Sequence, residues 1–304
     1  MRLAFMGTPD FAVPSLRKLA AVHEVALVVT RPDAVRGRGR ALVPSAVKSA
    51  ALELGLEVIE ARRVTPELLD RLRDLDLDAV AVAAFGCILP DELLGIARMG
   101  CVNVHGSLLP RWRGAAPIQR AVLEGDERAG ISIMRIVHEL DAGAYCRQAS
   151  VEVGEKPCAT VMSELAELGA DELLLALAQM EDGTARWVDQ DESQVSYARK
   201  IDKREMLLDP ADGRLANRRR VQASLDAAPA RMALQGKGVR VLDARVSGEA
   251  LSQGGVLVRK GRVFLGCSDG AIELLRVKPD GKREMDVSAW AAGLQKRDLG
   301  WERA

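Results

Sequence analysis

The sequence has few of the residues that form metal sites or disulfide frameworks. Its 304 residues include three histidines and five cysteines, and the cysteines form no CxxC pair. The histidines have no metal-ligand spacing, and an odd number of unpaired cysteines is typical of a reducing compartment. We therefore predict a cytoplasmic protein that binds no metal.

Long hydrophobic runs are absent as well. The longest apolar runs, such as residues 79–85, are far shorter than the ~20 residues that a membrane-spanning helix needs. The chain starts with strand-like sequence and shows no signal-peptide pattern. With 48% apolar residues and zero net charge, it is not expected to be disordered. The length predicts two soluble domains and no membrane partner.

The balanced net charge conceals an uneven distribution. Residues 1–200 carry 23 Lys/Arg against 29 Asp/Glu, whereas residues 201–304 carry 20 against 14. A basic C-terminal third indicates a polyanionic partner. A chance fluctuation on a solvated surface would give the same balance, so charge alone leaves both interpretations open.

Strand-like and helical patterns alternate over the first two-thirds of the chain. The expected strands cover residues 3–6, 25–29, 79–85, 102–105 and 131–137. The expected helices cover residues 13–20, 44–54, 66–75, 117–124 and 160–180. This alternation predicts an α/β domain with a Rossmann-like, doubly wound parallel sheet.

The pattern changes in the last third. Four short segments of period two follow Gly236 and are separated by glycine-bearing turns, at residues 239–242, 256–258, 263–265 and 272–275. They predict a small antiparallel barrel or sandwich. We place a first domain at residues 1–183, a polar linker at 184–205 and the second domain at 206–304.

The most informative stretch follows the expected strand 102–105. Asn103 and His105 are two residues apart and so share one face of that strand, and glycine and proline end it soon afterwards. Open parallel sheets bind ligands at the carboxyl ends of their strands. An amide beside an imidazole offers two donors for an oxyanion on a carbonyl. The alternative is that both side chains only satisfy loop backbone.

Asp141 follows the next expected strand, so we expect it at the same crevice. A carboxylate near a histidine can fix its tautomer and relay a proton. The alternative is a turn or helix cap, a common place for an aspartate before small residues.

Residues 30–40 form a basic loop between a strand and a helix. Arg36, Arg38 and Arg40 alternate with glycines, so the loop is strongly positive and suited to a phosphate backbone. A plain solvated loop has the same composition, and the sequence does not separate the two.

Taken together, these stretches resemble the methionyl-tRNA formyltransferase family nearly end to end. The resemblance is carried by residues 5–12, 36–40, 44–48 and 84–90, and most specifically by residues 103–119. Within the last range, Asn-x-His and Ser-Leu-Leu-Pro occur across folate-dependent formyltransferases. The continuation Arg-Trp-Arg-Gly-Ala-Ala-Pro-Ile-Gln is more typical of the enzymes that act on tRNA.

The resemblance implies a Rossmann-like formyltransferase domain followed by a smaller, OB-like β-barrel that helps to bind tRNA. It implies 10-formyltetrahydrofolate as co-substrate and initiator methionyl-tRNA as acceptor. Asn103, His105 and Asp141 would be catalytic, and Arg36, Arg38 and Arg40 would contact the tRNA. The folate-binding residues would be Ser107, Leu108, Leu109, Pro110, Ile88 and Leu89.

The chain departs from the family pattern in two places. Residues 140–144 read Leu-Asp-Ala-Gly-Ala where the family usually has Leu-Asp-Thr-Gly-Asp, and residues 224–228 replace a usual Phe-Asn-Pro-x-Pro segment. The first departure resembles sugar-amine formyltransferases, which keeps a small-amine acceptor as an alternative. A nucleic-acid-binding module with a dead enzyme fold is a second alternative. A dinucleotide-dependent oxidoreductase is disfavoured because GxGxxG is absent after the first strand.

Overall fold

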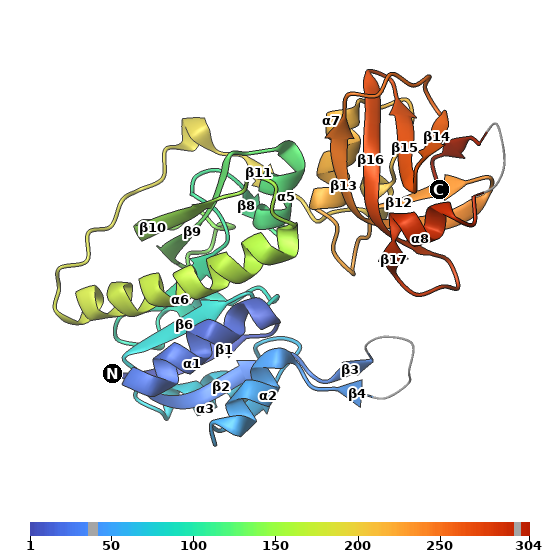
Figure 1. The fold of residues 1–304 in the computed structure, drawn as a ribbon. Helices are drawn as coiled ribbons and strands as arrows, with labels where there is room; N and C mark the ends of the chain where they lie inside the picture. The colour runs from blue at the N-terminus through green and yellow to red at the C-terminus, as the bar shows by residue number, and fades with distance from the viewer. Residues whose placement is uncertain (36–41, 295–298) are drawn as a thin grey trace. The chain divides into compact units, whose positions relative to one another are not determined.

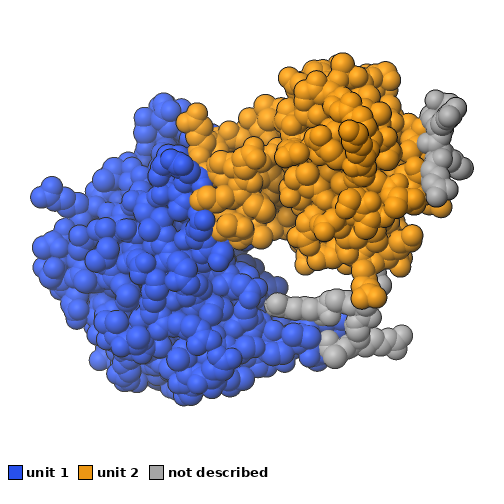
Figure 2. Space-filling view, in the orientation of Figure 1, with its two compact units in different colours: residues 1–117, 128–152, 162–198 blue, residues 118–127, 153–161, 199–304 orange. Residues whose placement is uncertain are grey.

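The computed structural model describes residues 1–35, 42–294 and 299–304. These residues form two compact units, which Figure 1 shows as a ribbon and Figure 2 in two colours. Unit 1 comprises residues 1–117, 128–152 and 162–198. Unit 2 comprises residues 118–127, 153–161 and 199–304. Each unit is therefore assembled from separate stretches of the chain.

Unit 1 is built on a seven-stranded sheet of order β10-β9-β7-β6-β1-β2-β5. Its five parallel strands are β1 (Arg2–Gly7), β2 (Glu24–Thr30), β5 (Val58–Glu60), β6 (Ala79–Ala83) and β7 (Cys101–His105). The sheet continues with β9 (Arg128–Arg135), which is antiparallel to β7, and β10 (Tyr145–Glu152), which is antiparallel to β9. The predicted fold class is confirmed, with one reversed strand, β9, between the five parallel strands and β10 at the edge.

Helices cover both faces of this sheet. They are α1 (Val13–Val22), α2 (Ala46–Glu53), α3 (Pro66–Arg73), α4 (Asp91–Leu94) and α6 (Cys158–Glu181). On one face, leucines of α3 pack with Val80 and Val82 of β6 in a buried cluster that also contains Cys101. On the other face, a Cβ on Gly169 of α6 would lie 2.7 Å from the Val104 side chain, so the helix approaches β7 closely. Alternate residues of β7 therefore face different helices.

Unit 2 contains an antiparallel sheet of order β14-β15-β16-β13-β12-β18. Its strands are β12 (Arg231–Leu234), β13 (Lys237–Ser247), β14 (Val256–Arg259), β15 (Arg262–Cys267), β16 (Gly270–Pro279), β17 (Met285–Asp286, paired with β16) and β18 (Trp301–Glu302). The sheet curls until its ends meet, because Gly255 bridges Gly300 and the Trp301 amide donates to the Gly254 carbonyl at 2.9 Å. The predicted small barrel is confirmed.

Helices complete unit 2. They are α5 (Pro117–Glu124, all but its first residue), α7 (Arg214–Gln222) and α8 (Val287–Ala291). The Gln119 amide donates to the Ala223 carbonyl at 2.8 Å, and the Gln222 amide donates to the Gly154 carbonyl at 2.8 Å. Stretches from the middle of the chain are thus bonded to the end of α7. Within the described ranges, no helix is long and apolar enough to cross a membrane.

Candidate active site

Asn103 and His105 lie at the carboxyl end of β7, on the same face as Cys101. Val102 and Val104 between them are buried, as the alternation predicts. Asn103 is half-buried, and its amide has no hydrogen-bond partner among the described residues. This amide is therefore a donor left available to a bound molecule.

His105 is held at one ring nitrogen. The ring is nearly buried, at 5% exposed, and Nε2 lies 3.0 Å from the carbonyl oxygen of Trp112. A carbonyl only accepts, so Nε2 carries a hydrogen and donates it. The opposite nitrogen, Nδ1, lies 3.7 Å from Oδ2 of Asp141. That separation is too long for a direct hydrogen bond but close enough for charge attraction when the imidazole is protonated.

Asp141 reaches His105 by a route that differs from the prediction. Because β9 is antiparallel to β7, its carboxyl end lies beside the start of β7, with Arg135 opposite Val102. The loop after β9 then returns along the sheet and brings the Asp141 carboxylate to His105. There Oδ2 also accepts a 2.9 Å hydrogen bond from the Gly114 amide.

The backbone around Asp141 is tightly constrained. Asp141 has φ of 49°, in the left-handed region that aspartate tolerates better than most residues. Two residues later, a Cβ on Gly143 would lie 2.0 Å from the Arg135 carbonyl oxygen, so only glycine fits there. The departures at Ala142 and Ala144 leave both features in place.

The loop 107–110, expected to line a folate site, is hydrogen-bonded through its backbone to Ser132 of β9. The Ser132 hydroxyl donates to the Ser107 carbonyl at 2.6 Å and accepts from the Leu109 amide at 3.1 Å. Ser107 and Leu109 are nearly buried, and the Ser107 hydroxyl donates to the Arg111 carbonyl at 2.6 Å. Leu108 lies over Gly130 of β9, where a Cβ would come within 2.5 Å of it. Pro110 is half-buried.

Ile88 and Leu89 belong to a second loop, after β6. Its backbone is fixed by side chains of two other loops: the Thr8 hydroxyl donates to the Phe85 carbonyl at 3.0 Å, and Arg31 donates to the Gly86 carbonyl at 2.6 Å. Ile88 is 91% exposed, whereas Leu89 is half-buried. An exposed isoleucine on a fixed loop is a surface available to an apolar ring.

The predicted tRNA-binding residues Arg36, Arg38 and Arg40 lie outside the described residues. On either side of them, β3 (Ala34–Val35) and β4 (Leu42–Val43) pair as a short antiparallel ladder. At its base, Lys48 forms ion pairs with Asp33 at 2.8 Å and Glu60 at 2.9 Å, which raise the pKa of the lysine.

Sequence reasoning missed a later segment, residues 185–198, that contacts the loops around His105 and Asp141. The short strands β8 (Arg113–Gly114) and β11 (Tyr197–Ala198) pair in parallel, and the Trp112 amide donates to the Ser196 hydroxyl at 3.0 Å. Gln190 contacts the Asp141 loop. A strand of two residues has no periodicity to detect, so the polar composition of this segment suggested only a linker.

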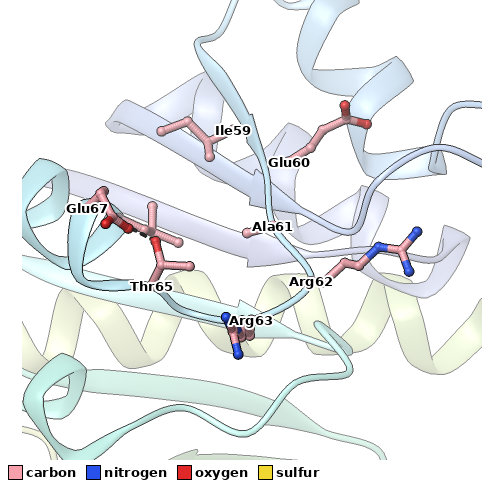
Figure 3. Close-up of a pocket in the computed structure, with 8 residues that line it drawn as sticks. Ile59, Glu60, Ala61, Arg62, Arg63, Thr65 and Glu67 are labelled. Carbon is pink, nitrogen blue, oxygen red and sulfur yellow. Dashed lines mark hydrogen bonds between the residues drawn. The ribbon is translucent and has the colours of Figure 1, made fainter.

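A pocket of about 400 Å³ lies elsewhere in unit 1, along β5 and the start of α3 (Figure 3). None of the predicted site residues lines it, and β5 is four positions from β7 in the strand order. The Thr65 hydroxyl holds the pKa of Glu67 below its usual value, and Figure 3 shows Arg62 directed away from that pair. Among the described residues, no group of three or more His, Cys, Asp or Glu could hold a metal ion.

Comparison with known proteins covers nearly the whole chain. A family model described as "Formyl transferase" matches residues 1–177, and another described as "Formyl transferase, C-terminal domain" matches residues 200–295. The methionyl-tRNA formyltransferase of Methylococcus capsulatus is 42% identical over 292 residues, covering 94% of this chain and 95% of that protein. That of Thiobacillus denitrificans is 41% identical over 300 residues, covering 96% of each.

Solved structures share the fold at much lower identity. The sugar 3N-formyl transferase WlaRD matches with a TM-score of 0.68 and 13% identity, over 93% of this chain and 99% of its own. HypX from Aquifex aeolicus in complex with tetrahydrofolic acid matches with a TM-score of 0.66 and 18% identity, over 99% of this chain and 50% of its own. Because both family models match and curated relatives exceed 40% identity along nearly their whole lengths, the chain belongs to the formyltransferase family, alongside the methionyl-tRNA formyltransferases.

Proposed function

We propose that the protein transfers a formyl group from 10-formyltetrahydrofolate to the α-amine of initiator methionyl-tRNA, and so supports translation initiation in the cytoplasm. The observation that carries the proposal is the convergence of Asn103, His105 and Asp141 at the end of β7. It occurs in a chain that aligns nearly end to end with methionyl-tRNA formyltransferases.

The reaction needs little activation of its nucleophile. An α-amine has a pKa of ~7.7–8.0, so a useful fraction is neutral near pH 7. Its lone pair attacks the formyl carbon and forms a C–N bond, while the carbonyl electrons move to oxygen. The C–N bond to the folate then breaks as a proton passes from the new ammonium to the departing nitrogen.

The three polar residues supply what these steps require. The free amide of Asn103 donates a hydrogen bond to the oxyanion of the tetrahedral intermediate. His105 donates from Nδ1, because Nε2 is occupied by the Trp112 carbonyl. Asp141, 3.7 Å from Nδ1, orients the protonated imidazole. Through water, it also relays the proton from the new ammonium to the departing folate nitrogen.

The two fixed loops form the folate site. Since the Ser107 hydroxyl and the Leu109 side chain are used within their own loop, residues 107–110 contribute backbone and the flanks of Leu108 and Pro110. Ile88 and Leu89 on the loop after β6 pack against the pterin ring. Both loops are held by side-chain hydrogen bonds, so the site is already formed before folate binds.

The acceptor tRNA is bound by basic residues outside this crevice. Arg36, Arg38 and Arg40 contact the acceptor end, and the basic third of the chain contributes further phosphate contacts. We also propose residues 1–183 as the catalytic domain, 184–205 as the linker and 206–304 as the tRNA-binding domain, although residues 184–198 of that linker pack within unit 1.

The test is formyl transfer from 10-formyltetrahydrofolate to charged initiator methionyl-tRNA, with free amino sugars assayed in parallel. We expect formylated tRNA and no sugar product. Formylated sugar without tRNA product would instead favour the small-amine alternative suggested by Ala142 and Ala144. No transfer to either acceptor would favour a nucleic-acid-binding module without activity.

A further inference from the structure

The segment 185–198 packs on β9, β10 and the loop that carries Asp141. The backbone of Val188 pairs with Tyr145 of β10 through hydrogen bonds of 2.8 and 3.1 Å. The Trp187 ring lies 4.1 Å from the guanidinium carbon of Arg135, a cation–π contact. These contacts place Gln190 beside the loop that carries Asp141.

Gln190 bonds to both sides of the Asp141 turn. Its Nε2 donates to the carbonyl of Asp141 and to the carbonyl of Gly143, each at 2.8 Å. Its Oε1 accepts from Nε of Arg113 at 2.9 Å. Carbonyls only accept and a guanidinium only donates, so this is the one orientation of the amide that satisfies all three contacts.

Arg113 is itself immobilised. Its side chain is 4% exposed, and its terminal nitrogens reach the two oxygens of Glu192 at 2.7 and 3.4 Å. The next residue, Gly114, donates its amide to the Asp141 carboxylate. Side chain and backbone of Asp141 are thus fixed through one connected set of contacts, with Gln190 at its centre.

We infer that Gln190 is a positioning residue for formyl transfer, holding Asp141 in its left-handed conformation so that the carboxylate faces Nδ1 of His105. This inference rests on the role proposed above for Asp141. Without the two donated hydrogen bonds, the turn is free to relax from φ of 49°, and the carboxylate moves away from the ring.

The test compares Gln190→Glu with the wild type in steady-state formylation of methionyl-tRNA. The glutamate keeps the size of the side chain and an acceptor for Arg113 but cannot donate to either carbonyl. Because a 1 Å misplacement of a catalytic group can cost about 10²-fold, we expect kcat to fall by about 10- to 100-fold while the KM for each substrate changes little. Gln190→Ala should behave similarly.

Two controls separate positioning from general damage. Gln194→Ala alters a neighbouring glutamine whose side chain, among the described residues, bonds only to the exposed Ser193 hydroxyl, and the kcat of this variant should be unchanged. The pH profile of kcat should shift in Gln190→Glu, whereas lower stability alone would reduce the amount of active enzyme and leave the profile in place. A normal kcat in Gln190→Glu, or an unshifted profile, would overturn the inference.

The dependence on Asp141 is tested separately. If Gln190 acts through Asp141, the double variant Gln190→Glu/Asp141→Asn should be no slower than Asp141→Asn alone. Fully additive losses would show that Gln190 acts elsewhere. Normal activity of Asp141→Asn would overturn the proposed role of Asp141 itself, whatever the result at Gln190.

Discussion

Asn103 and His105 differ in how freely each can bind the reacting oxygen. One edge of the His105 ring is committed to the Trp112 carbonyl, and the other faces the Asp141 carboxylate. The Asn103 amide has no such commitments among the described residues, so its removal disturbs the protein least. It is the most direct probe of oxyanion stabilisation.

Asn103→Ala should lower kcat by ~10²–10³, the usual cost of one oxyanion donor. Folate affinity should change little, because the donor acts on charge that develops only in the intermediate. Turnover of methionyl-tRNA and equilibrium binding of a folate analogue give the two quantities. Asn103→Asp is the matched variant of equal size without the donor, and near-normal turnover in both would remove Asn103 from the mechanism.

A site residue could be predicted from the sequence only where a local pattern of residues, such as strand alternation, indicated its position. Strand alternation in residues 102–105 correctly placed Asn103 and His105 on one face. Asp141 was placed at the crevice on the assumption of a parallel strand, whereas a returning loop brings it there. Gln190 gave no signal, because the carbonyls that it bonds are 47 and 49 residues away and it lies outside any helix or strand.

The folate loop depends on a strand beneath it. Ser132 is fully buried and bonds to two backbone groups of the loop 107–110, and its hydroxyl also accepts from Gln148 at 2.9 Å. One hydroxyl therefore connects the loop to both β9 and β10. Its loss leaves the Ser107 carbonyl buried without this donor.

Ser132→Ala should destabilise the protein by about 1–3 kcal/mol, the cost of leaving a buried polar group unsatisfied, and should raise the KM for 10-formyltetrahydrofolate. Thermal unfolding and formylation kinetics measure the two effects. Ser150→Ala on β10 is the control, since within the described part of the chain that hydroxyl bonds only to the exposed Arg128 side chain. An unchanged KM in Ser132→Ala would show that the loop keeps its shape without this anchor.

In unit 2, a buried carboxylate sits between two arginines on neighbouring strands. Glu273 of β16 accepts from Arg262 of β15 at 2.6 and 2.7 Å and from Arg245 of β13 at 2.8 Å. The Arg262 hydrogen bonds, opposed by burial and helped by Arg245, lower the pKa of Glu273 from its usual 4.5 to about 2. The ionised form is therefore bound more tightly in the folded protein.

The stabilisation from Glu273 should be complete above about pH 4.5 and should disappear as the pH falls towards 2, because protonation then breaks the ion pairs. Glu273→Gln should accordingly have a lower Tm than the wild type near neutral pH, with the difference shrinking through that window. Glu284→Gln, whose carboxylate pairs with Arg276 at the surface, is the control. A constant difference across the window would contradict the assignment.

Helices and strands with clear periodicity were predicted well, but the direction of each strand within the sheet was not. The runs that became β1, β2 and β6 were recognised because strands covered on both faces are continuously apolar, and β7 was recognised by its alternation. The same pattern gave no information on direction, so the antiparallel course of β9 was missed. Pairs as short as β8 and β11 depend on tertiary contacts, which no local pattern records.

On the scale of the whole molecule, the basic third and the arginine loop together predict salt-dependent binding of the acceptor. Replacing Arg36, Arg38 and Arg40 with alanine should reduce the slope of log Kd against log salt by about 2–3, if each arginine neutralises one phosphate. Filter binding of initiator tRNA over a range of salt concentrations gives the slope. Arg17→Ala, on α1, is the control, and an unchanged slope in the triple variant would refute the loop assignment.

Unit 2 is built from three separate stretches of the chain, which affects the order in which the protein folds during synthesis. Gln119 bonds to Ala223, which is 104 residues later in the chain. Synthesis of those residues takes roughly 5–20 s at about 5–20 residues per second. Until then Ile118, Val122 and Val161, buried in the finished protein, have not met all of their partners. We expect ribosome-bound chains stalled near residue 200 to be cleaved by protease around residues 118–127 and 153–161. The growing chain would therefore offer a chaperone these apolar stretches for several seconds before the barrel emerges.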